Sequence, residues 1–322
     1  MGKFVKTFGE MTKEDIQEAG GKAANLGELT RNGFNIPPGF CVTSESLSYH
    51  TEKNNLQPKI DAIVASFDYE EFGEMEEKTA QIRDLIANAE IPEDLYKEIS
   101  GAITALNTPE QSFVAVRSSV AVKDSTISSF PGMMDTYHYL ESQEEIVEHI
   151  RKCWASLWTT RAVAARRHKD IDHKLGLIAP IVQKMVHSEV AGVLFTANPI
   201  TNSRDEMVIE ANWGLGESVV SGKSMNDFFL LDHSSGKEKS RKIAKKTIMS
   251  CFDQDKGFGR KEMAVSPDMM DATTLSEEQV NELGNISLKI EGVFGFPQDI
   301  EWAYQKGELF ILQSRNIRTL KE

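Results

Sequence analysis

Hydrophobic positions recur at two different spacings along this chain of 322 residues, and the spacing changes near residue 180. In segments 12–33 and 142–169 apolar residues recur every three or four positions, which is the spacing of one face of a helix. Segment 56–106 also has a helical pattern, with a largely polar surface. After about residue 178 the apolar positions instead form short runs that are typical of strands. These runs cover residues 179–186, 191–196, 206–211 and 226–232.

Turn-forming residues divide these elements further. Gly20 and Gly21 interrupt the first helical pattern, so we expect two helical pieces with a tight turn between them. Two more strands are predicted at 40–43 and 112–117, and a helix at about 275–293 precedes a closing hairpin at 298–315. The change of pattern predicts two lobes, comprising residues 1–190 and 191–322.

Composition narrows the possible classes of function. The net charge of −13 argues against a nucleic-acid-binding surface, which needs a basic footprint, but allows the binding of a single nucleotide. The three cysteines, Cys41, Cys153 and Cys251, lie far apart, so neither a zinc site nor a disulfide framework is expected. No apolar run reaches the length of about 18 residues that spans a bilayer. The first residues do not resemble a signal peptide, and we expect a cytoplasmic protein with no membrane partner.

The first candidate phosphate site follows the strand at 112–117. Arg117 ends an apolar run and precedes two serines and a small-residue loop, a setting in which a guanidinium can hold phosphate in a bidentate way. Gly132 in that loop would let backbone N–H groups approach the anion closely. An arginine in a salt bridge at a strand end explains the same pattern, and the residues alone slightly favour that alternative.

Two further glycine-rich segments carry weaker signals. Lys22 follows two glycines near a helix start, where a lysine can contact phosphate, although most surface lysines have no such role. Residues 210–217 contain Gly-x-Gly after a predicted strand, but Val219 stands where the dinucleotide fingerprint has its third glycine. A tight turn between strand and helix accounts for these glycines as well as a phosphate contact does.

The closing hairpin predicts a more specific geometry. A three-residue loop at 306–308 would pair Glu301 with Gln313 and Asp299 with Arg315. A two-residue turn would instead put Glu301 and Gln313 on different faces. With the three-residue loop, these side chains would share one face, which would bring two oxygen ligands for Mg²⁺ close to an arginine. An exposed ladder of polar side chains is an equally good explanation of the pattern. The same register places four large apolar residues on the opposite, buried face: Trp302, Tyr304, Phe310 and Leu312.

Taken in order, several segments resemble one family of phosphotransferases, and the resemblance covers essentially the whole chain. It rests on GGKAANLGEL (20–29), IPPGF (36–40), VRSS (116–119), CWASL (153–157), GVLFTANP (192–199), NWGLGE (212–217), QDIEW (298–302) and QSR (313–315). These motifs are similar to those of the ATP-binding domain shared by phosphoenolpyruvate synthase, pyruvate phosphate dikinase, rifampicin phosphotransferase and phenylphosphate synthase. The resemblance implies an α+β, ATP-grasp-like fold with ATP held in a cleft between two lobes, the second lobe carrying the metal-binding hairpin.

The resemblance also implies roles for individual residues. The implied ATP contacts are Lys22, Arg117, Gly132, Thr136, Gln183, Glu301, Gln313 and Arg315. Among these, Glu301 and Gln313 are the implied Mg²⁺ ligands, and Arg117 and Arg315 the implied catalytic residues. ATP would be the substrate and Mg²⁺ the cofactor, with catalysis by positioning and electrostatics. One departure is that the usual Ser-Arg-Pro-Ile-Thr ending has Asn316 in place of proline and Arg318 in place of threonine.

A second departure concerns the phosphoryl carrier. Full-length relatives pass phosphate through a histidine on a separate domain, and none of the seven histidines here lies in a segment resembling that domain. We therefore expect a dikinase-type enzyme that needs a histidine-bearing partner or domain, releases AMP, and serves an acceptor such as pyruvate or phenol. The chain would be either a split subunit or an excised domain. Alternatives are a self-contained small-molecule kinase and a nucleotide-sensing subunit without turnover.

Overall fold

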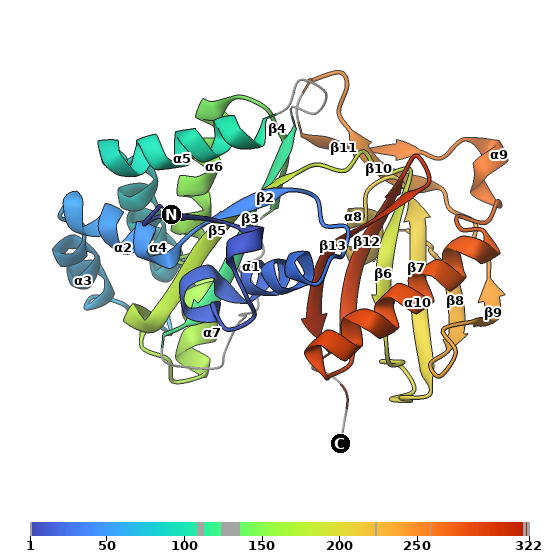
Figure 1. The fold of residues 1–322 in the computed structure, drawn as a ribbon. Helices are drawn as coiled ribbons and strands as arrows, with labels where there is room; N and C mark the ends of the chain where they lie inside the picture. Colours follow the sequence, from blue (N-terminus) through green and yellow to red (C-terminus); the bar gives the residue numbers. More distant parts are fainter. Residues whose placement is uncertain are drawn as a thin grey trace. The chain divides into compact units, whose positions relative to one another are not determined.

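The computed structural model describes residues 2–107, 113–123, 136–222, 224–257, 259–317 and 320. Contacts divide the chain into two units (Figure 1). Unit 1 comprises residues 1–31 and 38–185, and unit 2 comprises residues 32–37 and 186–322. Each unit combines an antiparallel sheet with packed helices, so the α+β class expected from the sequence is confirmed. The assignment of two ATP-grasp lobes to residues 1–190 and 191–322 stays a prediction.

Within the described residues, unit 1 contains a five-stranded sheet in which every neighbouring pair is antiparallel. In spatial order its strands are β1 (Val5–Thr7), β2 (Gly39–Val42), β5 (Gly176–Lys184), β3 (Val114–Val122) and β4 (Thr136–Leu140). The helices around it are α1 (Ile16–Arg31), α2 (Ser44–Lys53), α3 (Gln57–Val64), α4 (Phe72–Asn88), α5 (Glu93–Leu106), α6 (Gln143–Ser156) and α7 (Thr160–His168), with short 3₁₀ turns at Phe8–Glu10 and His173–Leu175.

Alternation along β3 assigns its side chains to two faces. Val114, Val116, Val120 and Val122 join the main hydrophobic core, which includes residues of α4, α5 and α6. Because successive strand residues point to opposite faces, the intervening side chains, Arg117 among them, face the other way. Helix α1 packs against β3 and β5. Helices therefore cover the face of the sheet that carries the valines. The opposite face, which carries Arg117, holds polar residues and α1.

Among the described residues of unit 2, six strands form a second antiparallel sheet. In spatial order these are β13 (Glu308–Asn316), β12 (Gln298–Gln305), β6 (Val190–Phe195), β7 (Glu206–Trp213), β8 (Asp227–Asp232) and β9 (Glu238–Lys242). The strands β10 (Ile248–Phe252) and β11 (Arg260–Ala264) form a separate hairpin. The helices are α8 (Glu217–Val220), α9 (Pro267–Met270) and α10 (Glu277–Phe294).

Helix α10 lies against one face of this second sheet. On that face the rings of Trp302 and Tyr304 are buried 5.8 Å apart. The Tyr304 hydroxyl donates to Glu282 Oε2 of α10 at 2.7 Å. The side chains on the other face of β12, including Glu301, therefore point away from α10.

Segment 32–37 covers the outer edge of β13. Ile311 N–H donates to the Asn35 carbonyl at 2.9 Å, and the Asn35 side-chain amide donates to the Leu309 carbonyl at 2.9 Å. This pairing satisfies backbone groups that an edge strand would otherwise leave open. It also explains why six residues that follow α1 in the sequence belong to unit 2.

The predicted segments agree with most of these elements. The pattern at 142–169 is divided into α6 and α7, and the kink expected at Gly20-Gly21 is present because Gly20 has φ 70° and ψ 168°. The pattern missed the strands β1, β4, β9, β10 and β11, each of which has five residues or fewer. Within the described part of the chain, no helix combines the length and apolar composition that a bilayer crossing requires.

A buried ion pair holds together one end of unit 2. Lys246 and Asp227 are both fully buried, with Lys246 Nζ 2.6 Å from Asp227 Oδ1. The carboxylate also accepts from the backbone N–H groups of Ala244 and Thr274 and from the Thr274 hydroxyl. The pair therefore ties the start of β8 to two loops that are distant in sequence.

Removing only the cation should destabilise the chain strongly, because an uncompensated carboxylate would remain buried. For Lys246→Met we expect a loss of about 3–5 kcal/mol in the free energy of unfolding, measured by urea denaturation. The control is Lys245→Met at the exposed neighbouring position, which should change it by less than about 0.5 kcal/mol. Equal effects of the two substitutions would contradict this assignment.

Candidate functional site

Three of the expected nucleotide contacts come together on the sheet of unit 1. Arg117 on β3 lies directly opposite Thr136 on β4, and Gln183 lies on β5, the other neighbour of β3. Arg117 Nη1 donates to Gln183 Oε1 at 3.3 Å, and both side chains are buried. Since Arg117 and Thr136 are directly paired, their side chains share the face that is opposite the valine core. The structure thus builds a polar cluster where the sequence predicted one.

Lys22, the fourth expected contact, is positioned by the kink of α1. Gly20 adopts a backbone conformation that is essentially restricted to glycine, and a Cβ atom there would lie 2.4 Å from Ser119 Oγ. After the kink, Ala23 N–H donates to Ser119 Oγ at 3.1 Å. This bond ties the residue after Lys22 to the strand that carries Arg117. Gly132 lies outside the described residues.

The remaining expected residues lie on the β12–β13 hairpin of unit 2. Glu301 is paired with Gln313, and Asp299 with Arg315, as the sequence predicted. Gln313 Nε2 donates to Glu301 Oε1 at 3.0 Å. Arg315 Nε and one of its terminal nitrogens each lie 2.7 Å from Asp299 Oδ2. Two acidic side chains, an amide and a guanidinium therefore share one face of the hairpin.

The prediction of a three-residue loop for this hairpin is wrong, and so is part of the prediction of its apolar face. The turn has two residues, Lys306 and Gly307, with φ 52° and 79°, a combination typical of a type I′ turn. The pairing then shifts by one residue between Glu301 and Trp302, which indicates a β-bulge at Leu312. The bulge restores the expected pairing of Glu301 with Gln313 although the turn is one residue shorter.

The shorter turn changes the partners of the aromatic residues. Trp302 is opposite Ile311, and Tyr304 is opposite Leu309. Phe310 and Leu312, expected beside Trp302, instead pack against a small cluster containing Ala303 on the other face. The register near the turn is thus one residue away from the predicted one.

Asp299, which the sequence pattern placed only as the partner of Arg315, lies near the expected metal ligand Glu301. Its side chain is about nine-tenths buried. Burial raises the pKa of its carboxyl group, Arg315 lowers that pKa in part, and nearby Glu301 raises it further. The alternating acids in β12 were the signal that could have added Asp299 to the site.

The hairpin fits a hard divalent cation by the chemistry of its donors. No group of three or more His, Cys, Asp or Glu side chains suited to a metal occurs among the described residues. Mg²⁺ often takes only one or two carboxylates from the protein and its other oxygens from water and phosphate. Glu301, with the amide of Gln313 and the carboxylate of Asp299 beside it, provides such a set. Burial and the nearby Glu301 both disfavour a negative charge on Asp299. A bound cation would offset that charge.

The Gly-x-Gly segment has a structural explanation in the described chain. Gly214 has φ 75°, and a Cβ atom there would lie 2.2 Å from the Ser250 carbonyl oxygen. The following short helix α8 starts at Glu217, so the glycines occupy a tight strand-to-helix turn beside β10. This explains Gly214 without a ligand.

Comparison with known proteins adds the family. The protein family described as "Pyruvate phosphate dikinase, AMP/ATP-binding domain" matches residues 16–322 of this chain. The chain belongs to this family. It is 38% identical to "Probable phosphoenolpyruvate synthase" of Pyrococcus horikoshii, over 99% of this chain and 44% of that protein. It is 37% identical to "Rifampicin phosphotransferase" of Bacillus subtilis, over 99% of this chain and 36% of that protein. The resemblance inferred from the motifs is confirmed.

The chain spans less than half the length of these two relatives. Among solved structures, "D-alanine--D-Alanine Ligase" from Bacillus anthracis matches 77% of this chain and 67% of its own, at 6% identity and a TM-score of 0.27.

The kink at Gly20 should be essential to the position of Lys22. We expect Gly20→Ala to lower the free energy of unfolding by about 2 kcal/mol or more, because it combines backbone strain with a collision with β3. Urea denaturation measures this change. The control is Gly101→Ala in α5, where a Cβ atom has open space; it should stabilise by roughly 0.5–1 kcal/mol. A neutral Gly20→Ala would mean that α1 does not need this close approach to β3.

Proposed function

We propose that this chain binds ATP with Mg²⁺ and transfers a phosphoryl or pyrophosphoryl group to a histidine on a separate domain or partner chain. AMP would be released, and the histidine would pass phosphate to a small acceptor such as pyruvate or phenol. We also propose that the two units are the lobes of an ATP-grasp-like fold. Membership of the AMP/ATP-binding domain family supports the nucleotide as ligand.

The observation that carries the proposal is the pairing of polar side chains on the hairpin. Glu301 with Gln313, and Asp299 with Arg315, form two adjacent cross-strand pairs on one face. The first pair offers oxygen ligands to a cation, and Arg315, about half exposed, can reach a phosphate while Asp299 holds its guanidinium. A purely structural polar ladder needs neither a nearly buried Asp299 nor a buried Gln313.

Unit 1 would supply the other contacts to the nucleotide. Gln183 holds the guanidinium of Arg117 on the sheet, and Thr136 lies opposite it. Such a fixed, buried cation stabilises negative charge more than a mobile surface residue does, because little reorganisation accompanies the reaction. We propose Lys22 and Gly132 as additional phosphate contacts, the first as a point charge and the second through backbone N–H groups.

A bound Mg²⁺ would neutralise charge on the phosphate oxygens during transfer. Glu301 and Gln313 would hold it, and Asp299 would add negative charge from the next row of the sheet. Arg117 and Arg315 would orient the phosphates and balance the charge that develops on them. Catalysis of this kind depends on positioning and electrostatics and requires no protein nucleophile in this chain.

Loss of the proposed metal ligand should weaken binding only when metal is present. For Glu301→Ala we expect the affinity for a non-hydrolysable ATP analogue with Mg²⁺ to fall at least about 30-fold, the effect of losing one charged contact of about 2 kcal/mol. The same titration in EDTA should show little difference from wild type. Isothermal titration calorimetry measures both.

The matched control for this variant is Glu308→Gln, an exposed glutamate near the turn of the same hairpin. Its affinity should remain within about twofold of wild type. Unchanged Mg²⁺ dependence in Glu301→Ala would refute the assignment of the metal to the hairpin. Arg117→Ala should reduce binding both with and without metal, since it acts on the phosphates directly.

The transfer step can be tested by supplying the histidine in trans. The chain would be mixed with Mg²⁺, ATP and the remaining part of the Pyrococcus horikoshii relative, and acid-labile phosphate on that part and AMP would be followed. We expect both products only when all components are present. Phosphorylation of a small molecule by the chain alone would favour a self-contained kinase, and nucleotide binding without any product would favour a sensing subunit.

A further inference from the structure

A buried glutamine lies on the reverse face of the β12–β13 hairpin, at the end that carries Arg315. Gln298 is the first residue of β12 and is fully buried. Because side chains alternate along a strand, Gln298 points to the face opposite Asp299 and Glu301. It therefore makes none of the proposed contacts to metal or phosphate. A buried amide is costly unless its hydrogen bonds are made within the protein.

The amide of Gln298 bonds to both sequence neighbours of Arg315. Its Oε1 accepts from Ser314 Oγ at 2.7 Å, and its Nε2 donates to Asn316 Oδ1 at 2.8 Å. Nε2 also donates to the carbonyl of Phe296 at 2.7 Å. Both the acceptor and the donor of the amide are thus bonded. A buried network with its groups satisfied rigidifies the segments that it joins, which here include residues 314–316.

The backbone of Gln298 is fixed from the interior of the sheet. Its N–H donates to Thr196 Oγ1 at 2.8 Å, and its carbonyl accepts from the Thr196 N–H at 2.9 Å. Thr196 is fully buried and directly follows β6, the neighbour of β12 on the side away from β13. The amide that bonds the edge strand β13 is therefore anchored on an inner strand.

This end of β13 depends on that anchor more than the turn end does. The bonds that segment 32–37 makes to β13 lie near the turn, at Leu309 and Ile311. Asn316 is exposed at the other end, and it stands where the usual ending has proline, so no ring fixes its φ. The hydrogen bond from Gln298 constrains the exit of the strand in place of that ring.

Two consecutive residues of β12 thus hold Arg315 from opposite faces. Asp299 Oδ2 accepts from Arg315 Nε at 2.7 Å on the face of the proposed site. Gln298 holds the residues on either side of Arg315 from the reverse face. A guanidinium that is fixed before the ligand arrives loses less freedom on binding, which increases affinity.

We propose that Gln298 is a positioning residue of the nucleotide site. By bonding Ser314 and Asn316 it holds the strand segment that carries Arg315, and so directs the guanidinium toward the phosphates. Gln298 does not touch the nucleotide. This role rests on the proposed function, because it requires that Arg315 contacts phosphate.

Gln298→Met removes the amide and keeps most of the side-chain volume. Its affinity for a non-hydrolysable ATP analogue with Mg²⁺ would be measured by isothermal titration calorimetry. We expect binding about fivefold weaker than wild type, because the guanidinium loses its fixed position. In the ¹⁵N-labelled chain without nucleotide, the Arg315 Nε–H signal should broaden or move toward the signals of exposed arginines.

A double-mutant cycle distinguishes positioning from a general effect on the sheet. If Gln298 acts through Arg315, its loss should matter little when the guanidinium is absent. In an Arg315→Ala background we expect Gln298→Met to weaken binding by less than about 1.5-fold. A fivefold loss in both backgrounds would show a general disturbance of the sheet and would overturn the proposal.

Asn316→Ala is a milder variant, and it decides the question if Gln298→Met does not fold. It removes one partner of the amide at an exposed position and leaves Gln298 in place. We expect binding of the same analogue about two- to threefold weaker than wild type, with the same change in the Arg315 Nε–H signal.

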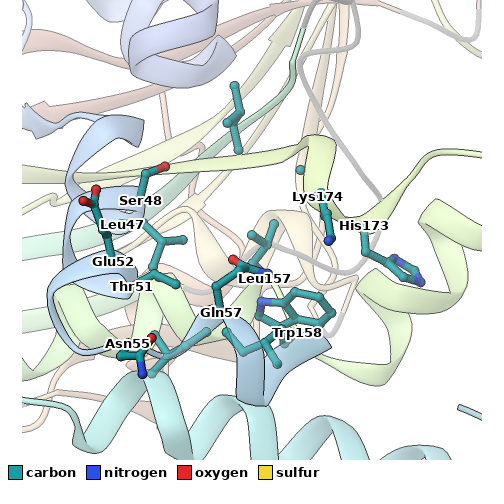
Figure 2. Close-up of a pocket in the computed structure, with 14 residues that line it drawn as sticks. Leu47, Ser48, Thr51, Glu52, Asn55, Gln57, Leu157, Trp158, His173 and Lys174 are labelled. Carbon is teal, nitrogen blue, oxygen red and sulfur yellow. The ribbon is translucent and has the colours of Figure 1, made fainter. Parts of the chain in front are cut away.

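Two control variants remove hydrogen bonds elsewhere. Tyr304→Phe removes the bond to Glu282 Oε2 on the same face of β12, near the turn. Gln57→Met makes the same substitution in unit 1, where Gln57 lines a cavity of about 480 Å³ (Figure 2) and donates to Asp61 Oδ1 at 2.8 Å. Both should bind the analogue within about twofold of wild type and leave the Arg315 signal unchanged.

The two readouts separate failure of this role from failure of the proposed function. An unchanged Arg315 Nε–H signal in both Gln298→Met and Asn316→Ala would overturn the positioning role. So would an equal loss of affinity in Tyr304→Phe. A wild-type chain that binds no ATP analogue, or Arg315→Ala binding as tightly as wild type, would instead contradict the proposed function. The Arg315 signal would still decide whether Gln298 holds that residue.

Discussion

The backbone pairing of β12 with β13 determines which side chains share a face with Glu301. A hairpin has a side-chain period of two, so an error of one residue in register would move Gln313 and Arg315 to the side covered by α10. A two-residue turn at Lys306-Gly307 and a bulge at Leu312 together give the observed register. The acidic pair, the amide and the guanidinium are neighbours only because these two features offset each other.

The first unit depends on a comparable constraint at Gly20. The left-handed kink brings α1 so close to β3 that a Cβ atom has no room, and Ser119 bonds to the helix just after Lys22. Arg117, two residues before Ser119, is held from the other side by Gln183. The cationic residues of the proposed site therefore depend on backbone geometry and buried hydrogen bonds, which keeps them in place before any ligand arrives.

Local pattern was sufficient to predict most helices and strands and the polar cluster, for identifiable reasons. The kink at Gly20-Gly21 and the alternation of Asp299 and Glu301 lie within a few residues of the signals that predict them. The strand end predicted at Arg117 is wrong, because β3 continues to Val122 and Arg117 lies inside it. The motifs then identified the family, which the comparisons confirm. The roles of individual residues in binding ATP stay predictions.

What local pattern could not predict depends on distant contacts or on backbone details. The bulge at Leu312 has no local sequence signal. Without it, the two-residue turn would have put Glu301 and Gln313 on different faces. Segment 32–37 joins unit 2 through bonds between Asn35 and residues near 310, which no local periodicity reveals.

We propose that the Glu301 face of the hairpin holds the metal of a bound metal–nucleotide complex. Mn²⁺ can replace Mg²⁺ and broadens the NMR signals of nearby nuclei, so adding Mn²⁺ with a non-hydrolysable ATP analogue to the labelled chain would locate the metal. We expect selective broadening of amide signals around Asp299, Glu301 and Gln313, and its loss in Glu301→Ala. Broadening centred elsewhere in the chain, or unchanged in that variant, would rule out a metal at this hairpin.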